Sequence, residues 1–155
     1  MAFRGFTVTG IELGSQLARK AKLNVCKFTN ATILEGDFDT EELDPDFSKI
    51  RYFSANEVRK KGIQEVIEEI GKKVKGKIYF SIDMDGIDPS EAPGVGTPEP
   101  YGISSTEVRS LINHFAKRII GFDIVEMTPV YDNGNTSMLA AKFVQDFIGS
   151  KERQA

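Results

Sequence analysis

The sequence predicts an α/β fold, a three-layer α/β/α arrangement in which a mainly parallel sheet lies between helices. Two apolar, β-branched segments, Lys77–Ile82 and Ile119–Glu126, have the composition of buried strands. Helical patterns with one apolar stripe stand before and between them. Strands that alternate with helices favour right-handed crossovers and parallel pairing, so we expect these two strands to be neighbours that end at one edge of the sheet.

The first 49 residues show the weakest patterns. Segments 3–10 and 23–34 resemble short strands, and the segment at 14–22 between them could be helical. Residues 36–47 contain a glycine, a proline and six acidic residues, which is typical of an acidic loop. The whole chain, 1–155, is nevertheless expected to form a single domain, because its length is ordinary for one.

The second part of the chain is more regular. Residues 50–53 read as a short strand, and Ser54 with Glu57 forms a capping box that starts a helix. The next helix, Ile63–Ile70, has its apolar residues at i, i+3, i+4 and i+7. We expect Gly71 and Gly76 to end this helix, because glycine lowers helix propensity.

Two further helices are predicted toward the end of the chain. A second capping box, Ser104 with Glu107, starts a helix over Ser105–Lys117. Asn135 is expected to cap the last helix, which should stop before Gly149. Both helices have one apolar stripe and should therefore cover a face of the sheet.

Composition excludes several classes of protein. The chain has 155 residues, a mass of 17.2 kDa and a formal net charge of −3, and 40% of its residues are hydrophobic, so it should be globular. No basic stripe is present, which argues against binding of nucleic acid. There is no apolar segment of membrane-spanning length and no export signal at the start. Together with a lone cysteine, Cys26, expected to be a small buried hydrophobe, this favours a cytoplasmic protein.

Acidic residues stand at the carboxyl ends of both predicted strands. Asp83 and Asp85 are two positions apart, so they would lie on the same side of an extended strand. Such carboxylates repel each other unless a cation lies between them, and hard oxygen ligands suit Mg²⁺, Ca²⁺ or Mn²⁺. A hydrated acidic turn is the alternative, but the buried strand favours a metal site, because uncompensated charge is costly there. From spacing alone, Glu126 fits an ordinary strand-end carboxylate as well as a functional residue.

Two segments resemble consecutive blocks of the ureohydrolases, the family of arginases, agmatinases, guanidinobutyrases and formimidoylglutamases. The first block is SIDMDGIDPSEAPGVGTPEPYG, residues 81–102, and the second is GFDIVEMTPVYDNGNTSMLAAK, residues 121–142. The matching positions of the first block are Ser81, Asp83, Asp85, Asp88, Pro89, Pro93, Gly94, Gly96, Thr97, Pro98 and Gly102. With the preceding helix, the resemblance covers residues 50–149 and implies the C-terminal portion of an arginase-like fold.

This resemblance implies metal-dependent hydrolysis of a guanidino compound by two Mn²⁺ ions that are bridged by hydroxide. Asp83 and Asp85 would be metal ligands, Glu126 would pair with the guanidinium group, and Thr97 would hydrogen-bond on the substrate side. The segment EMTPVYD is closer to agmatinases, which convert agmatine to putrescine and urea, than to arginases. The expected partner is therefore a small guanidino substrate, and the expected assembly is a homo-oligomer.

The sequence also departs from the family pattern. Two earlier metal motifs, of the types GGDHS and DAHxDxxD, supply two histidines and two more aspartates in the family, and neither occurs here. The only histidine, His114, is off the apolar stripe of its helix and is expected at the surface. Acidic residues 37–44 have some resemblance to a calcium loop, but Glu42 occupies the position that requires glycine. The chain alone is therefore expected to lack part of the metal site.

Alternative interpretations stay open at this point. The chain could be a non-catalytic ureohydrolase fragment or an interaction module, because a missing half-sheet would leave an exposed edge. It could also be a ureohydrolase for another guanidino compound. The least favoured alternative is a haloacid-dehalogenase-like phosphatase with Asp83 as nucleophile, Asp85 as acid/base and Mg²⁺ as cofactor, since Ile87 stands where that motif has Thr or Val.

Overall fold

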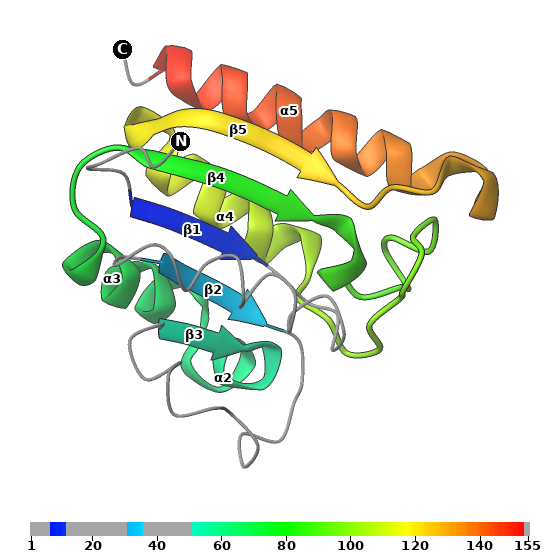
Figure 1. Ribbon diagram of the computed structural model, residues 1–155, viewed down its shortest axis with the longest axis horizontal. Coiled ribbons are helices and arrows are strands. Elements are labelled where there is room, and N and C mark those ends of the chain that lie inside the picture. Colours follow the sequence, from blue (N-terminus) through cyan, green and yellow to red (C-terminus); the bar gives the residue numbers. More distant parts are fainter. Residues whose placement is uncertain (1–6, 12–30, 36–50, 154–155) are drawn as a thin grey trace, which may run out of the picture.

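A parallel sheet with helices packed against it forms the centre of the computed structural model, which describes residues 7–11, 31–35 and 51–153 (Figure 1). Its strands are β1 Thr7–Ile11, β2 Ala31–Glu35, β3 Arg51–Ser54, β4 Ile78–Asp83 and β5 Ile119–Val125. Their order across the sheet is β3-β2-β1-β4-β5, and every neighbouring pair is parallel. The predicted α/β class and the parallel sheet are both confirmed.

The two strands expected to carry the acidic residues are neighbours. Phe80 of β4 lies opposite Phe122 of β5, and Asp83 lies opposite Val125, so both strands end at the same edge. β4 includes Asp83 as its last residue, and β5 ends one residue before Glu126. The predicted adjacency and common direction are therefore confirmed, with both ends of β4 and the C-terminal end of β5 shifted by one residue.

The helices follow the predicted pattern but run longer than expected in two places. They are α2 Ala55–Lys61, α3 Ile63–Lys73, α4 Ser105–Phe115 and α5 Asn135–Arg153, and a 3₁₀ turn, Ala116–Arg118, continues α4. Both predicted capping boxes, at Ser54 and Ser104, are present. The helix predicted over Ile63–Ile70 runs past Gly71 to Lys73, short of Gly76, and α5 runs past the expected end at Gly149, because the buried Val74 and Ser150 keep the chain packed against the core.

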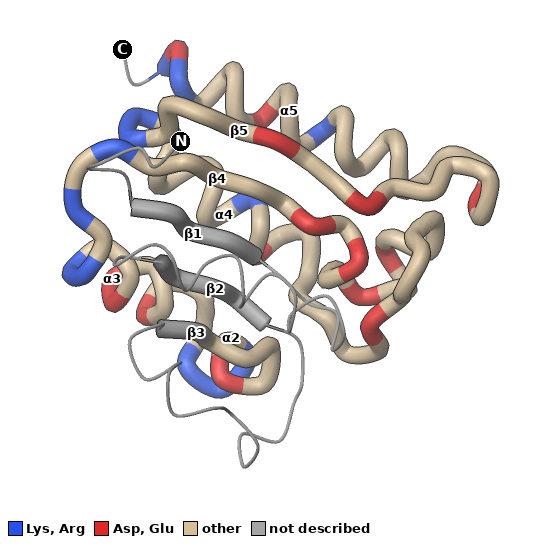
Figure 2. The backbone as a smooth tube through the Cα atoms, in the orientation of Figure 1, with Lys and Arg blue, Asp and Glu red and all other residues tan. Residues whose placement is uncertain are grey.

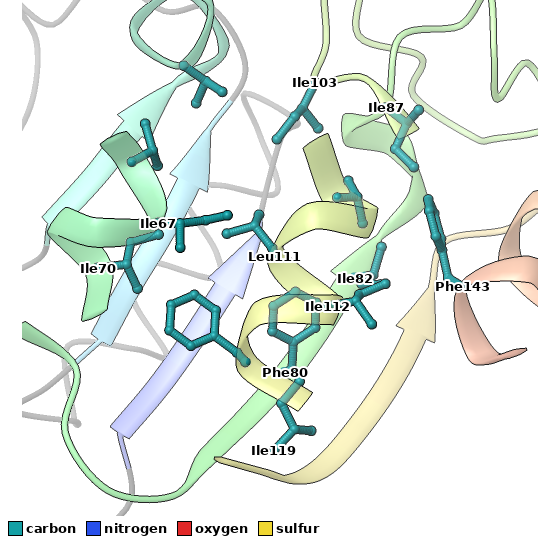
Figure 3. Packing of buried hydrophobic residues seen from close by; sticks show 14 of the residues in the cluster. Ile67, Ile70, Phe80, Ile82, Ile87, Ile103, Leu111, Ile112, Ile119 and Phe143 are labelled. Carbon is teal, nitrogen blue, oxygen red and sulfur yellow. The ribbon is translucent and has the colours of Figure 1, made fainter. Parts of the chain in front are cut away.

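One apolar core joins the helices to a single face of the sheet. Figure 3 shows α3 beside β2 and β3 and α4 over β1 and β4, with Ile67 of α3 and Leu111 of α4 pointing toward one another within the core. Along β4 the residues alternate, since Ile78, Phe80 and Ile82 are buried while Tyr79 is exposed. None of the helices in the described ranges is long and apolar enough to cross a membrane.

Some predictions fall outside the described residues and are not tested by the structure. These are the helical segment 14–22, Cys26 and the acidic loop 36–47. The strands expected within 3–10 and 23–34 overlap β1 and β2.

The described helices α2 to α5 form one layer in sequence order, each in contact with the next.

The packing of α5 gives the first testable prediction. Phe143 is 1% exposed in the core, whereas its neighbour Val144 is 40% exposed. Phe143→Ala should lower the free energy of unfolding by about 3–5 kcal/mol, because it opens a cavity between α5 and the sheet. Val144→Ala should change it by only about 0.5 kcal/mol. Urea unfolding followed by circular dichroism measures both values, and equal losses would contradict the placement of α5.

Candidate functional site

The segments around the carboxyl ends of β4 and β5 are acidic and contain no basic residue in the sequence. Residues 78–108 and 119–141 contain no lysine or arginine, although they include the ends of both β4 and β5. Figure 2 shows acidic residues at and beyond the carboxyl ends of these strands, while lysines and arginines gather at the opposite end. Such a separation of charge favours a cationic ligand at the carboxyl edge.

Asp83 and Asp85 come together through a turn at the end of β4. The chain leaves the strand at a 3₁₀ turn, Met84–Gly86, for which Asp83 is the N-cap. The N–H of Asp85 donates to Oδ1 of Asp83 at 2.9 Å. The two residues are only 5% and 1% exposed. The expectation that both lie on an extended strand was therefore wrong in detail, because the turn and not strand alternation brings them together.

Thr97 contacts Asp85 directly. Its N–H donates to Oδ1 of Asp85 at 3.2 Å, and its hydroxyl donates to Oδ2 of the same carboxylate. These bonds compensate a buried charge that would otherwise be costly. The structure therefore gives Thr97 a role in holding Asp85, which sequence reasoning missed, and the substrate-side role of Thr97 stays a prediction.

Glu126 follows β5 directly and has an unusual backbone conformation. Its φ of +62° lies in the left-handed region, which costs a non-glycine residue roughly 1–3 kcal/mol. The next residue, Met127, forms an antiparallel bridge with Val95, and the N–H of Thr128 donates to the carbonyl of Gly94 at 2.8 Å. These contacts hold an exposed acid at the edge of the sheet where Asp83 also lies.

The loop between β4 and α4 is tied down along its length. Arg59 donates from α2 to the carbonyl of Gly102 at 2.7 Å, and Ile87 pairs with Ile103. Gly102 has no room for a side chain, since an added Cβ would lie 2.6 Å from the carbonyl oxygen of Gly86. The hydroxyl and N–H of Ser90 donate to Asp88 and lower the pKa of its carboxyl. The loop that carries Thr97 therefore has a defined path.

Asp83 and Asp85 fit part of a metal site. They offer two buried carboxylates, which suit hard cations such as Mn²⁺ or Mg²⁺. Across the described ranges, however, no group of three or more His, Cys, Asp or Glu side chains is arranged to hold a metal. His114 is exposed on α4, as predicted, and its ring meets the ring of Phe115 edge to face. The described residues therefore offer two candidate ligands, fewer than a two-ion centre requires.

The contact between Thr97 and Asp85 yields a second prediction. Thr97→Val removes the hydroxyl and should lower the free energy of unfolding by about 1–3 kcal/mol, because the buried carboxylate loses a charge-assisted hydrogen bond. Thr97→Ser keeps the donor and should retain most of the stability. Chemical denaturation of the three proteins at neutral pH checks this. If Thr97→Ser loses as much as Thr97→Val, the hydroxyl is not what stabilises Asp85.

The comparison with solved structures supports the same fold. The chain aligns with the crystal structure of agmatine ureohydrolase of Thermoplasma volcanium at a TM-score of 0.84 and 41% identity, covering 97% of this chain and 56% of that one. It also aligns with the arginase from Bacillus subtilis at a TM-score of 0.80 and 22% identity, covering 94% of this chain and 64% of that one, which shows the likeness of fold alone. The fold is therefore arginase-like.

Curated relatives match a shorter part of the chain. Guanidinobutyrase of Pseudomonas aeruginosa is 39% identical over 63% of this chain and 32% of its own length. Agmatinase of Chromobacterium violaceum is 34% identical over 64% of this chain and 31% of its own length. The chain thus spans about a third of the length of these relatives.

A family model matches nearly the whole chain. The model of the arginase family aligns with residues 8–149. This match begins in the part of the sequence where motifs gave no resemblance, and it includes β1 and β2. It also includes both segments that carry Asp83, Asp85 and Glu126, and it favours the ureohydrolase interpretation over the phosphatase one. The chain belongs to the arginase family.

Proposed function

We propose that this chain carries the carboxylate part of a ureohydrolase site that acts on agmatine. In this proposal Asp83 and Asp85 are ligands of Mn²⁺, and Glu126 pairs with the guanidinium group of the substrate. The observation that carries it is the buried pair of carboxylates at the end of β4, beside an exposed glutamate that follows β5. Membership of the arginase family supports the assignment of metal and guanidinium binding to this edge of the sheet.

The acidic carboxyl edge suits both cations of the proposal, Mn²⁺ and the guanidinium group of the substrate. A guanidinium is planar and matches a carboxylate through two parallel hydrogen bonds. Glu126 is the only acid in residues 124–131 and is exposed, so a substrate can reach it. Its left-handed backbone sets the direction in which the chain leaves β5, and strain of this kind clusters at functional sites.

Agmatine is the proposed substrate because of the segment that follows β5 and the relatives that match. The sequence EMTPVYD resembles agmatinases, and a chain from Thermoplasma volcanium named as an agmatine ureohydrolase is 41% identical. Relatives named as guanidinobutyrase and proclavaminate amidinohydrolase are 39% and 38% identical, so a different guanidino compound is the main competitor. The shared chemistry is a guanidinium at one end of a small linear molecule.

The proposal assigns this chain two metal ligands and a guanidinium carboxylate, and no more. Bound Mn²⁺ supplies a more acidic water, which becomes a nucleophile near neutral pH. Asp83 and Asp85 would hold the metal, and Thr97 would fix the orientation of Asp85 through the bonds described above. Because the sequence has one histidine and neither of the earlier family motifs, further ligands have to come from outside the described site.

The 155-residue chain should therefore bind Mn²⁺ weakly and release urea from agmatine at a negligible rate. Two carboxylates give only part of a coordination shell, and binding of substrate without an activated nucleophile gives no turnover. Isothermal titration calorimetry with Mn²⁺ and a colorimetric urea assay measure the two properties. Mn²⁺-dependent urea release by the purified chain, abolished by Asp83→Asn, would show that the site is complete and that this part of the proposal is wrong.

Matched variants separate the roles within the site. Asp83→Asn should abolish Mn²⁺ binding, whereas Glu126→Gln should leave it unchanged and weaken the binding of agmatine. Asp123→Asn is the control, because Asp123 is a carboxylate of the same sheet that bonds to Tyr79 and Ser81 within the strands. Equal loss of Mn²⁺ binding in Asp83→Asn and Asp123→Asn would mean that the overall negative charge attracts the ion and that Asp83 does not belong to a specific metal site.

A second candidate function, self-association, is favoured by the free edge of the sheet. Within the described strands β5 pairs only with β4, and its one charged residue is Asp123. Ile120 on β5 and Ile148 on α5 are each 51% exposed. Figure 1 shows α5 running beside β5 along this edge. An edge strand with a single charged residue and exposed apolar neighbours is a template for pairing, and the proposed occupant is a second copy of this chain.

Self-association at this edge predicts a specific effect of charge. Ile120→Lys should raise the dissociation constant of the dimer by at least about tenfold, because it places a charge in the apolar contact. Val130→Lys is the control, since Val130 is 85% exposed but lies in a 3₁₀ turn beyond β5. Sedimentation velocity over a range of concentrations measures both. A monomer at every concentration, or a dimer that is unaffected by Ile120→Lys, would exclude this interface.

A further inference from the structure

We infer that Asp132 and Thr136 are positioning residues that hold the two segments of the site, Gly94–Thr97 and Glu126–Thr128, in a fixed arrangement. We call the group formed by Gly94, Asp132 and Thr136 the Gly94 clamp. The inference rests on the proposed function of Asp85 and Glu126, and it adds residues outside the metal and guanidinium positions. The first of its parts is the hydroxyl of Thr136.

Thr136 is 0% exposed at the start of α5, and its hydroxyl links two segments. The N–H of Gly94 donates to this hydroxyl at 2.7 Å. The hydroxyl in turn donates to the carboxylate of Asp132, which also accepts from the N–H groups of Gly134 and Thr136 at 2.8 Å. These donors lower the pKa of Asp132, so the carboxylate stays ionised and accepting at neutral pH.

Gly94 fits the clamp because it has no side chain. An added Cβ would lie 2.6 Å from the carboxyl carbon and from Oδ2 of Asp132, and 2.9 Å from Oδ1. That carboxylate cannot move aside without losing its bonds to the first turn of α5. Both backbone groups of Gly94 form hydrogen bonds. Its N–H donates to the hydroxyl of Thr136, and its carbonyl accepts from the N–H of Thr128 at 2.8 Å.

The clamp reaches both functional carboxylates through short lengths of chain. One residue after Gly94, Val95 pairs with Met127, which directly follows Glu126. Three residues after Gly94, Thr97 donates to Asp85. Glu126 has a strained backbone that persists only where neighbouring contacts determine it. Loss of the bond between Thr136 and Gly94 should therefore loosen both Thr97 and the segment after Glu126.

A simple helix cap would not need all of these contacts. Capping of α5 by Asp132 requires the N–H groups of Gly134 and Thr136, and these bonds do not involve the hydroxyl of Thr136. The hydroxyl accepts from Gly94, a residue 42 positions away in the sequence. Substitution of the hydroxyl therefore separates positioning of the loop from capping of the helix.

The test compares Thr136→Val, Thr136→Ser and the wild-type chain by amide hydrogen exchange, followed by nuclear magnetic resonance. Thr136→Val should speed exchange at the N–H groups of Gly94, Thr97 and Thr128 by about tenfold, the effect of losing one hydrogen bond. Thr136→Ser keeps the hydroxyl and should restore slow exchange. Thr106→Val is the control for loss of a threonine hydroxyl at an exposed position near the start of α4.

The same samples are then titrated with Mn²⁺, which broadens signals of nearby amides even when it binds weakly. Broadening at Asp83 and Asp85 in the wild-type chain should be reduced in Thr136→Val and retained in Thr136→Ser. Faster exchange at Gly94 alone, with Thr97 and Thr128 unchanged, would overturn the clamp, and so would a Thr136→Ser variant that behaves like Thr136→Val. If the exchange pattern is as expected but Mn²⁺ broadens nothing near Asp83, the clamp stands and the proposed function fails. Should Thr136→Val not fold, Thr136→Ala serves as the second variant, because it removes the same hydroxyl and has the same expected exchange pattern.

Discussion

The burial of two carboxylates at the end of β4 is the constraint on which the surrounding structure depends. Asp83 and Asp85 carry like charges in a nearly water-free position, so each needs donors close by. The N–H of Asp85 and the two donors of Thr97 meet part of this need. The loop that brings Thr97 there must return to the edge of the sheet, and its contacts with Thr128 and Thr136 hold it in place. A bound cation would complete this compensation, which is why the pair favours a metal function.

The local features of the fold could be predicted from the sequence because their causes are local. Capping boxes at Ser54 and Ser104, the apolar stripe of α3 and the two buried strands depend on residues within a few positions of each other. The fold class followed from the alternation of these elements. The ends of α3 and α5 did not follow, because tertiary packing of Val74 and Ser150 outweighs the low helix propensity of glycine.

The residues of the candidate site could be proposed from the sequence, but their geometry could not. The acids at the strand ends stand out in the sequence, whereas the contact of Thr97 with Asp85 depends on the path of a loop between distant elements. Nothing near Glu126 in the sequence indicates its left-handed backbone. The link from Thr136 to Gly94 spans 42 residues and involves a hydroxyl that otherwise reads as part of a helix start. Contacts of this kind arise from the fold and are not visible in local patterns.

The proposed cation site at the carboxyl end of β4 consists of Asp83 and Asp85. Anomalous scattering from a crystal of this chain soaked with Mn²⁺ tests this site most directly, because it locates the metal without assuming any activity. We expect an anomalous peak between the carboxylates of Asp83 and Asp85, absent from crystals of Asp83→Asn. A peak on another acidic group such as residues 37–44, or no peak at a concentration that saturates the site in solution, would contradict it.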